Sequence, residues 1–192
     1  MKLHKPLWVI ALALFTWTSV VPATLAAWQE KQQPKKEAAD EEEPKTPADK
    51  AARDELIAKA CGPKVNHSAD TDKKQHPTPT APADKALIYV IRPTMMGNKI
   101  QTKLAVDGTW VGINRGNNYF FFTLDPGEHY FCSTAENKSV FAMKVEAGKT
   151  YFLQQKIRMG FMKASNKLEQ ISEAEGQKGL TKCHPSTFAE KK

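Results

Sequence analysis

Cysteine and histidine are the residues of this chain best suited to chemistry, and the 192 residues contain three Cys and five His. Cys183 and His184 are adjacent, whereas His129 and Cys132 would point to opposite faces of a strand. Neither spacing predicts a nucleophilic cysteine–histidine pair. The sequence has no Cys-x-x-Cys, Gly-x-Ser-x-Gly, His-Glu-x-x-His or phosphate-binding glycine motif. We therefore predict no catalytic residues and no cofactor.

One short stretch combines residue types that bind metals, namely His67, Asp70, Asp72 and His76. Two histidines with two carboxylates could hold zinc loosely. The Asp70–Asp72 pair lacks the glycine and the terminal glutamate of a calcium loop. The surrounding residues are polar and rich in lysine and proline, which favours a solvated linker. We predict no metal site.

The N-terminus has the pattern of an export signal. A short basic stretch ending at Lys5 precedes the uncharged residues 7–21, and residues 24–26 offer small side chains for cleavage after Ala26. We predict a signal peptide over residues 1–26, an exported mature protein in the periplasm or outside the cell, and no stable membrane span after cleavage. The alternative is an uncleaved inner-membrane anchor, because residues 6–28 are all uncharged.

Residues 27–84 have the composition of a solvated, disordered linker, because bulky apolar residues are rare and Lys, Glu, Pro and Thr dominate. A short helix is expected near residues 47–61. Thr46 can cap it, Asp49 completes a capping box, and Gly62-Pro63 ends it.

Charge is divided unevenly between the linker and the rest of the mature chain. Residues 28–84 carry 10 basic and 12 acidic side chains, and residues 85–192 carry 16 basic and 9 acidic ones. Outside the cytoplasm, a basic surface favours an envelope protein or an anionic wall or lipid polymer as partner. We predict no binding to nucleic acid.

Residues 85–183 have the pattern of a small antiparallel β-sandwich of about seven strands. Strand-like stretches alternate with turn signals about every 8 to 15 residues. The expected strands are residues 86–92, 101–106, 109–113, 119–123, 129–133, 139–145 and 150–157. Ser172 and Glu175 form a capping box for a short C-terminal helix, and residues 184–192 are expected to be a frayed basic tail.

The aromatic stretch Tyr119–Phe122 raises the question of a binding surface. Side chains alternate along a strand, so Tyr119 and Phe121 face away from Phe120 and Phe122. One of these pairs must therefore be covered by something outside the sandwich core. The linker helix or the C-terminal helix would be a structural cover, and a partner or ligand is the functional alternative. The candidate surface residues are Trp110, Arg115, Tyr119 and Phe121.

The cysteines are expected to form one disulfide in an oxidising compartment. Cys61–Cys132 would attach the short helix to the sheet, while Cys61–Cys183 and Cys132–Cys183 remain open. Closing a loop of about 70 residues stabilises a fold by up to about 4 kcal/mol in the chain-entropy model. The third cysteine would be free or would join another chain.

Several short motifs together carry a family resemblance. They are Val106-Asp107-Gly108-Thr109-Trp110-Val111-Gly112, the aromatic strand, Asp125-Pro126-Gly127-Glu128-His129, Ala147-Gly148-Lys149-Thr150-Tyr151-Phe152 and Ile171-Ser172-Glu173-Ala174-Glu175-Gly176. The chain from about Lys85 to Lys182 resembles the bacterial domain-of-unknown-function family 2846, with a more distant likeness to PEGA repeats. The resemblance implies an exported small β-sandwich with no known activity. It also supports the pair Cys61–Cys132, because family members are similar at the Ala-Cys-Gly-Pro segment and at the Cys after Pro-Gly-Glu-His.

These patterns predict an exported, non-enzymatic binding or scaffold module of the cell envelope. The first alternative is a periplasmic carrier of a small ligand such as a glycan or lipid, which would need the aromatic side chains to line a concave pocket. The second is an uncharacterised enzyme, which would need polar side chains that converge in a cleft.

Overall fold

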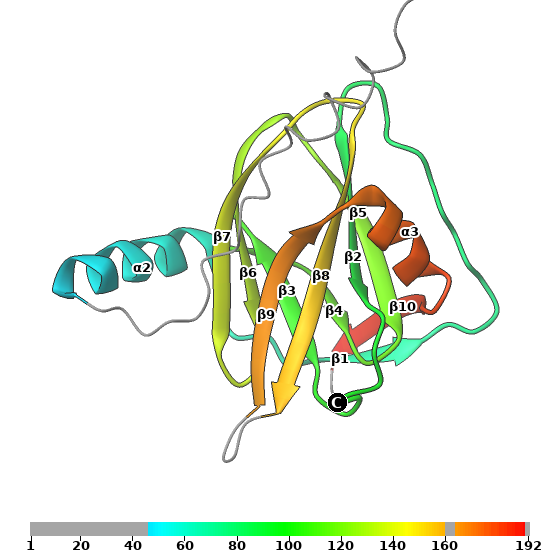
Figure 1. Ribbon diagram of the computed structural model, residues 1–192, viewed down its shortest axis with the longest axis horizontal. Helices are drawn as coiled ribbons and strands as arrows, with labels where there is room; N and C mark the ends of the chain where they lie inside the picture. Colours follow the sequence, from blue (N-terminus) through cyan, green and yellow to red (C-terminus); the bar gives the residue numbers. More distant parts are fainter. Residues whose placement is uncertain (1–45, 160–163, 191–192) are drawn as a thin grey trace, which may run out of the picture. The chain divides into compact units, whose positions relative to one another are not determined.

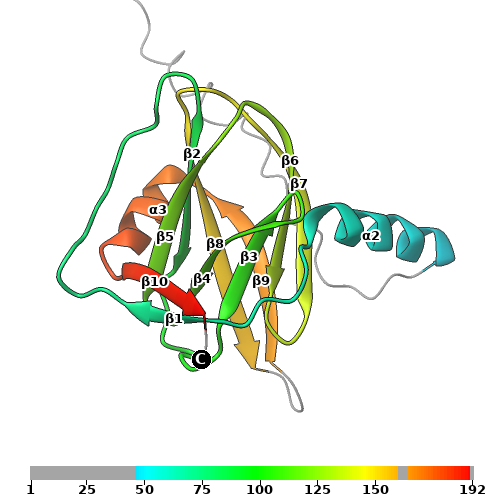
Figure 2. The same cartoon turned by 180° about the vertical axis from the view of Figure 1, so that it is seen from behind.

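A computed structural model describes residues 46–159 and 164–190. These residues form ten strands in two β-sheets and two helices, with one helix on the outer side of each sheet (Figures 1 and 2). The predicted signal peptide, residues 1–26, lies outside the described residues. Neither of the two described helices is long and apolar enough to cross a membrane.

The larger sheet has six strands in the order β1-β10-β5-β2-β8-β9, and the smaller has four in the order β4-β3-β6-β7. The six strands are β1 (His67–Thr71), β10 (His184–Glu190), β5 (Asn118–Leu124), β2 (Ala86–Arg92), β8 (Thr150–Met159) and β9 (Ala164–Ile171). The four are β4 (Thr109–Asn114), β3 (Thr102–Val106), β6 (Gly127–Thr134) and β7 (Lys138–Val145). The predicted mainly β sandwich is confirmed.

Three strands extend the prediction of about seven. Strand β9 was not predicted, because the polar Asn166 occupies a buried position between Ala164 and Leu168 and breaks the apolar–polar alternation. The expected frayed tail is wrong for residues 184–190, which form β10, and β10 pairs with β1 inside the expected linker. The sheets are also not wholly antiparallel, because β2–β8 and β10–β5 pair in parallel.

The apolar core lies between the two sheets. It is built from the inward-facing side chains of both sheets, including Ile88, Val90, Leu104, Phe120, Phe131, Phe141, Leu153 and Leu168. Every residue of β2 is buried, which is typical of a strand covered on both faces. The side chains of β2 that point away from the core must therefore be covered by another part of the chain.

One end of the sandwich interior is polar. Gln155 accepts hydrogen bonds from Thr102 Oγ1 at 2.9 Å and Asn114 Nδ2 at 3.1 Å, and it donates to Ser133 Oγ at 3.0 Å. All four of these residues are fully buried. Arg92, also fully buried, donates to the main-chain oxygens of residues 96, 97 and 100, and burial lowers the pKa of its guanidinium to about 10. These bonds hold the 93–101 loop against the end of the sandwich.

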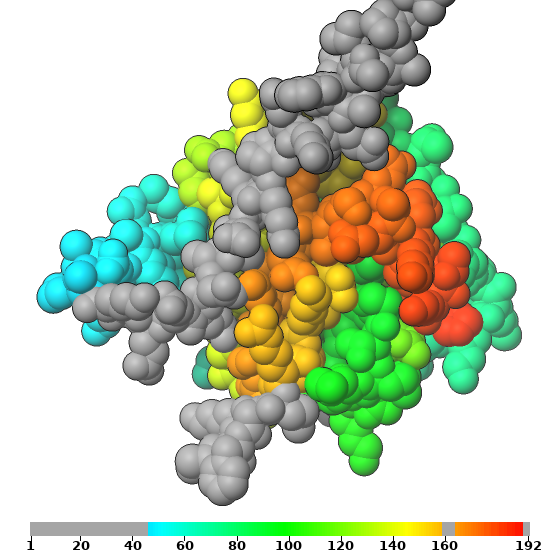
Figure 3. Space-filling view, viewed as in Figure 1, coloured from blue at the N-terminus to red at the C-terminus, as the bar shows by residue number. Residues whose placement is uncertain are grey.

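The two helices begin in the same way but cover different faces. Helix α2 (Pro47–Ala60) starts with the predicted capping box of Thr46 and Asp49, and helix α3 (Glu173–Leu180) starts with the one formed by Ser172 and Glu175. The C-terminal half of α2 packs on the outer face of the four-stranded sheet. Helix α3 packs on the outer face of the six-stranded sheet through Leu180. In Figure 3, α3 forms part of the visible surface, in orange.

Candidate functional site

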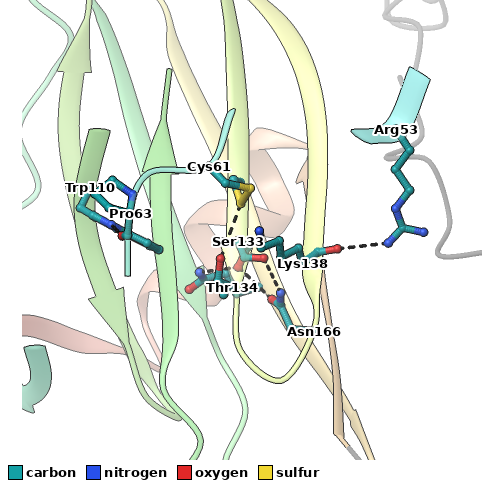
Figure 4. The surroundings of a disulfide bond; sticks show 10 residues. Arg53, Cys61, Pro63, Trp110, Ser133, Thr134, Lys138 and Asn166 are labelled. Atoms are coloured by element: carbon teal, nitrogen blue, oxygen red, sulfur yellow. Dashed lines mark hydrogen bonds between the residues drawn. A yellow bond between two sulfur atoms is a disulfide. The ribbon is translucent and has the colours of Figure 1, made fainter. Parts of the chain in front are cut away.

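A disulfide attaches the end of α2 to the four-stranded sheet. Cys61, the C-cap residue of α2, is bonded to Cys132 in β6, with the two sulfur atoms 2.04 Å apart. This is the pairing that the sequence favoured. Cys132 is fully buried, and its sulfur also lies 3.5 Å from Thr134 Oγ1 (Figure 4). Figure 4 also shows Arg53 of α2 directed toward Lys138, whose main-chain oxygen accepts a hydrogen bond from it.

The segment after α2 is held on the Asp107–Gly108 turn by close backbone contacts. Gly108 N donates to Ala60 O at 3.2 Å. A Cβ atom on Gly62 would lie 2.3 Å from Gly108 O, so only glycine allows this approach. Trp110 Nε1 donates to Pro63 O (Figure 4). The helix end is therefore fixed by main-chain contacts as well as by the disulfide.

His129 explains why the Asp107-Gly108 and Pro-Gly-Glu-His motifs occur together. Its Nδ1 lies 2.6 Å from Asp107 Oδ2, and its Nε2 lies 2.8 Å from Asp125 O. The other oxygen of Asp107 accepts from Tyr130 N at 2.9 Å, and Asp107 has a left-handed φ of 50°. His129 thus joins two turns that are far apart in the sequence.

The surroundings of His129 favour its charged form. Partial burial opposes the charge, but the hydrogen bonds to Asp107 and to the Asp125 carbonyl, together with both carboxylates, outweigh it and raise the pKa of His129. Both ring nitrogens face acceptors, and only the protonated imidazole can donate from both. Both ring nitrogens are therefore engaged by acceptors within the fold.

The four predicted surface residues do not come together. Trp110 packs beside the disulfide, against the segment after α2. Arg115 lies just after β4, and its Nη2 lies 3.1 Å from the terminal amide of Gln101, which accepts a hydrogen bond from it once the amide is turned so that its oxygen faces Arg115. Tyr119 and Phe121 lie on the outer face of the six-stranded sheet. Tyr119 is fully buried, so it is not an exposed contact residue in this fold.

The outward aromatic side chains of β2, β5 and β8 form one cluster, which we call the aromatic face: Tyr89, Tyr119, Phe121 and Phe152. The Tyr89 ring is stacked on Phe152 with centroids 5.2 Å apart, and it lies 5.6 Å from Phe121. Burial raises the pKa of both tyrosines, that of Tyr119 to about 12. Tyr89 was not among the residues predicted from the sequence, although the unbroken apolar run of β2 signals a strand that is covered on both faces.

Two elements cover the aromatic face. Helix α3 lies over Phe152 and Ile91, where Cβ atoms on Gly176 and Gly179 would come within 2.2 and 2.3 Å of those side chains. Residues 76–81, which we call the strap, lie over the tyrosines. Both tyrosines are therefore buried, whereas Phe121 is only partly buried.

The histidine and cysteine side chains considered above for chemistry make structural contacts. His76 Nε2 lies 3.0 Å from Cys183 O, and the His67 ring contacts Phe188 edge-on. Within the described ranges, no three His, Cys, Asp or Glu side chains are grouped as metal ligands would be. Cys183 is free and buried, and burial raises the pKa of its thiol to about 12. It therefore stays a thiol at neutral pH and is a poor nucleophile.

Comparison with known proteins agrees with the family resemblance that the sequence motifs predicted. Residues 82–167 match the family described as a protein of unknown function (DUF2846). A protein of Haemophilus influenzae, described as uncharacterized, is 31% identical over 98 residues, which cover 50% of this chain and 58% of the relative. The match thus spans less than two thirds of that relative. The predicted resemblance is therefore confirmed, with residues 82–167 of this chain matching the DUF2846 family.

Proposed function

We propose that this protein is exported and acts as a non-enzymatic binding or scaffold module of the cell envelope. The observation that carries the proposal is the Cys61–Cys132 disulfide, which connects residues 71 apart in the sequence. Such bonds persist in oxidising compartments and are rare in the cytosol. The N-terminal export pattern supports the same location.

The surface of the β domain suits anionic envelope partners. Lys138, Lys144, Arg158 and Lys182 have exposed side chains. A surface with excess positive charge attracts acidic proteins, wall polymers or lipid headgroups.

Export is tested by cell fractionation combined with thiol trapping. We expect the chain in an envelope or extracellular fraction, with one thiol reactive after denaturation and three after reduction. A variant lacking residues 2–26 is the matched control, and it should stay in the cytosol with three reactive thiols. Full-length protein found in the cytosol with three reactive thiols would refute the proposal.

Binding is tested by crosslinking in intact cells, followed by mass spectrometry of the purified adducts. The proposal predicts a reproducible adduct with one envelope protein or polymer. The variant retained in the cytosol should lack that adduct. Recovery of the exported chain only as an uncrosslinked monomer would argue against a binding or scaffold role.

A further inference from the structure

The strap and the aromatic face have the chemistry of a proline-rich peptide seated in an aromatic groove. Residues 76–81 read His-Pro-Thr-Pro-Thr-Ala, and Pro82 follows. Tyr119 Oη donates to Pro77 O at 2.9 Å, and Tyr89 Oη donates to Pro79 O at 2.8 Å. Aromatic grooves recognise extended proline-rich segments in this way, through ring contacts and hydrogen bonds to carbonyl oxygens.

Burial is unequal on the two sides of this contact. Tyr89 and Tyr119 are 2% and 0% exposed, whereas residues 76–80 of the strap are all exposed. Within the strap, Ala81 packs against the cluster of the aromatic face. His76 holds the other end through its ring, which lies 5.2 Å from Tyr119, and through its bond to Cys183 O. The strap therefore shields the tyrosines while burying little of itself.

The strands beneath the strap lie within the residues that match the family model, and the strap itself does not. Strands β2 and β5, which supply both tyrosines, lie within the matched residues 82–167, and the strap lies before them. Both tyrosines thus belong to the part of the chain that matches the family, and the strap that covers them comes from the flanking segment. Another extended segment with carbonyl groups two residues apart could make the same two hydrogen bonds.

We propose that the aromatic face is a docking groove for an extended proline-rich segment of a partner protein, and that the strap occupies this groove in the free chain. The inference rests on the proposed role as a binding module and names the chemistry of its partner. Bound in place of the strap, the partner segment accepts hydrogen bonds from Tyr89 and Tyr119. Prolines suit this site because they keep the segment extended before it binds.

The test measures binding of a fluorescent synthetic peptide with the sequence of residues 74–84 to the purified full-length chain, by fluorescence anisotropy. The double variant Pro77→Gly/Pro79→Gly keeps both carbonyls but makes the strap more flexible. We expect it to bind the peptide about tenfold more tightly than the wild type, because the internal competitor is weakened. A peptide with alanine in place of every proline should bind more weakly than the native peptide.

Two variants that each lack one tyrosine hydroxyl test whether the peptide binds at the aromatic face. In the strap variant, Tyr89→Phe and Tyr119→Phe should each weaken peptide binding about threefold to tenfold, since each removes one hydrogen bond. Tyr130→Phe, which removes a hydroxyl from the other sheet, is the matched control and should leave the affinity unchanged. Equal binding by the alanine peptide, or affinity unaffected by both tyrosine variants, would overturn the proposal.

A second measurement covers the case in which the strap variant does not fold. The wild-type chain is then mixed with millimolar peptide, and the ring signals of Tyr89 and Tyr119 are followed by NMR. Shifts at these rings support the groove, and unchanged rings at saturating peptide refute it. The assay uses purified protein, so its outcome is independent of the cell fractionation that tests export.

Discussion

The two outer faces of the sandwich are covered in different ways. The four-stranded sheet carries α2, which is attached by a disulfide and by backbone contacts at the Asp107–Gly108 turn. The six-stranded sheet carries α3 and the strap, which are held by packing and hydrogen bonds alone. A covalent cover stays in place when single contacts break, whereas a non-covalent one is in equilibrium with an open state. The comparison predicts a fixed face and an exchangeable face.

Removing the disulfide should have the largest effect on stability. The double variant Cys61→Ala/Cys132→Ala opens a loop whose ends are 71 residues apart, so we expect a loss of about 4 kcal/mol in the chain-entropy model. Chemical denaturation under oxidising conditions measures it. A reducing agent should destabilise the wild type and leave the double variant unchanged. Equal stability of both proteins under oxidising conditions would remove the basis for calling this face fixed.

Adding a side chain at Gly176 of α3 should destabilise the protein at the exchangeable face, which α3 and the strap cover. A Cβ atom at Gly176 would lie 2.2 Å from Phe152 Cγ, so Gly176→Ala should destabilise the protein by about 2 kcal/mol despite better helix propensity. Gln177→Ala, at an exposed neighbouring position, is the matched control and should be nearly neutral. Thermal unfolding measures both variants. A stabilised Gly176→Ala protein would show that α3 does not pack closely on the sheet.

The two helix caps give a direct comparison of the faces. Ser172→Ala should reduce global stability by about 1 kcal/mol, because α3 covers part of the sheet. Thr46→Ala removes the same kind of cap from the exposed end of α2, and we expect only local fraying with little global change. Denaturation gives the global effect, and hydrogen exchange gives the local one. Equal global losses would contradict the difference that we infer between the faces.

His129 should give a small, pH-dependent effect on the fixed face. Its pKa is raised by Asp107 and the Asp125 carbonyl over the opposing effect of burial, so its contribution is complete below the unfolded value of about 6.5. That contribution is lost as pH rises through the folded pKa. His129→Gln should therefore cost about 0.5 kcal/mol near pH 6 and less near pH 9. A cost that grows between these pH values would contradict the assignment.

Much of the candidate site was predictable, but its arrangement was not. Both capping boxes, the Asp107–Gly108 turn and the Cys61–Cys132 pair appear in the structure at the expected residues. Tyr119 was predicted as a candidate surface residue, with a linker or C-terminal helix as the structural alternative, and the structure buries it with its hydroxyl bonded to residue 77 of the expected linker. That part of the linker is 42 residues away, and no local pattern encodes such a distance.

The local elements of this protein follow from short stretches of its sequence. Caps, turns and alternating apolar residues act over a few neighbouring positions, so they can be read without knowing the fold. Three features depend instead on tertiary contacts: residues 184–190 form a strand, Gln155 and Asn166 are buried, and residues 76–81 lie over the tyrosines. These outcomes depend on partners distant in the chain, whose contacts outweigh local propensity once the two sheets pack.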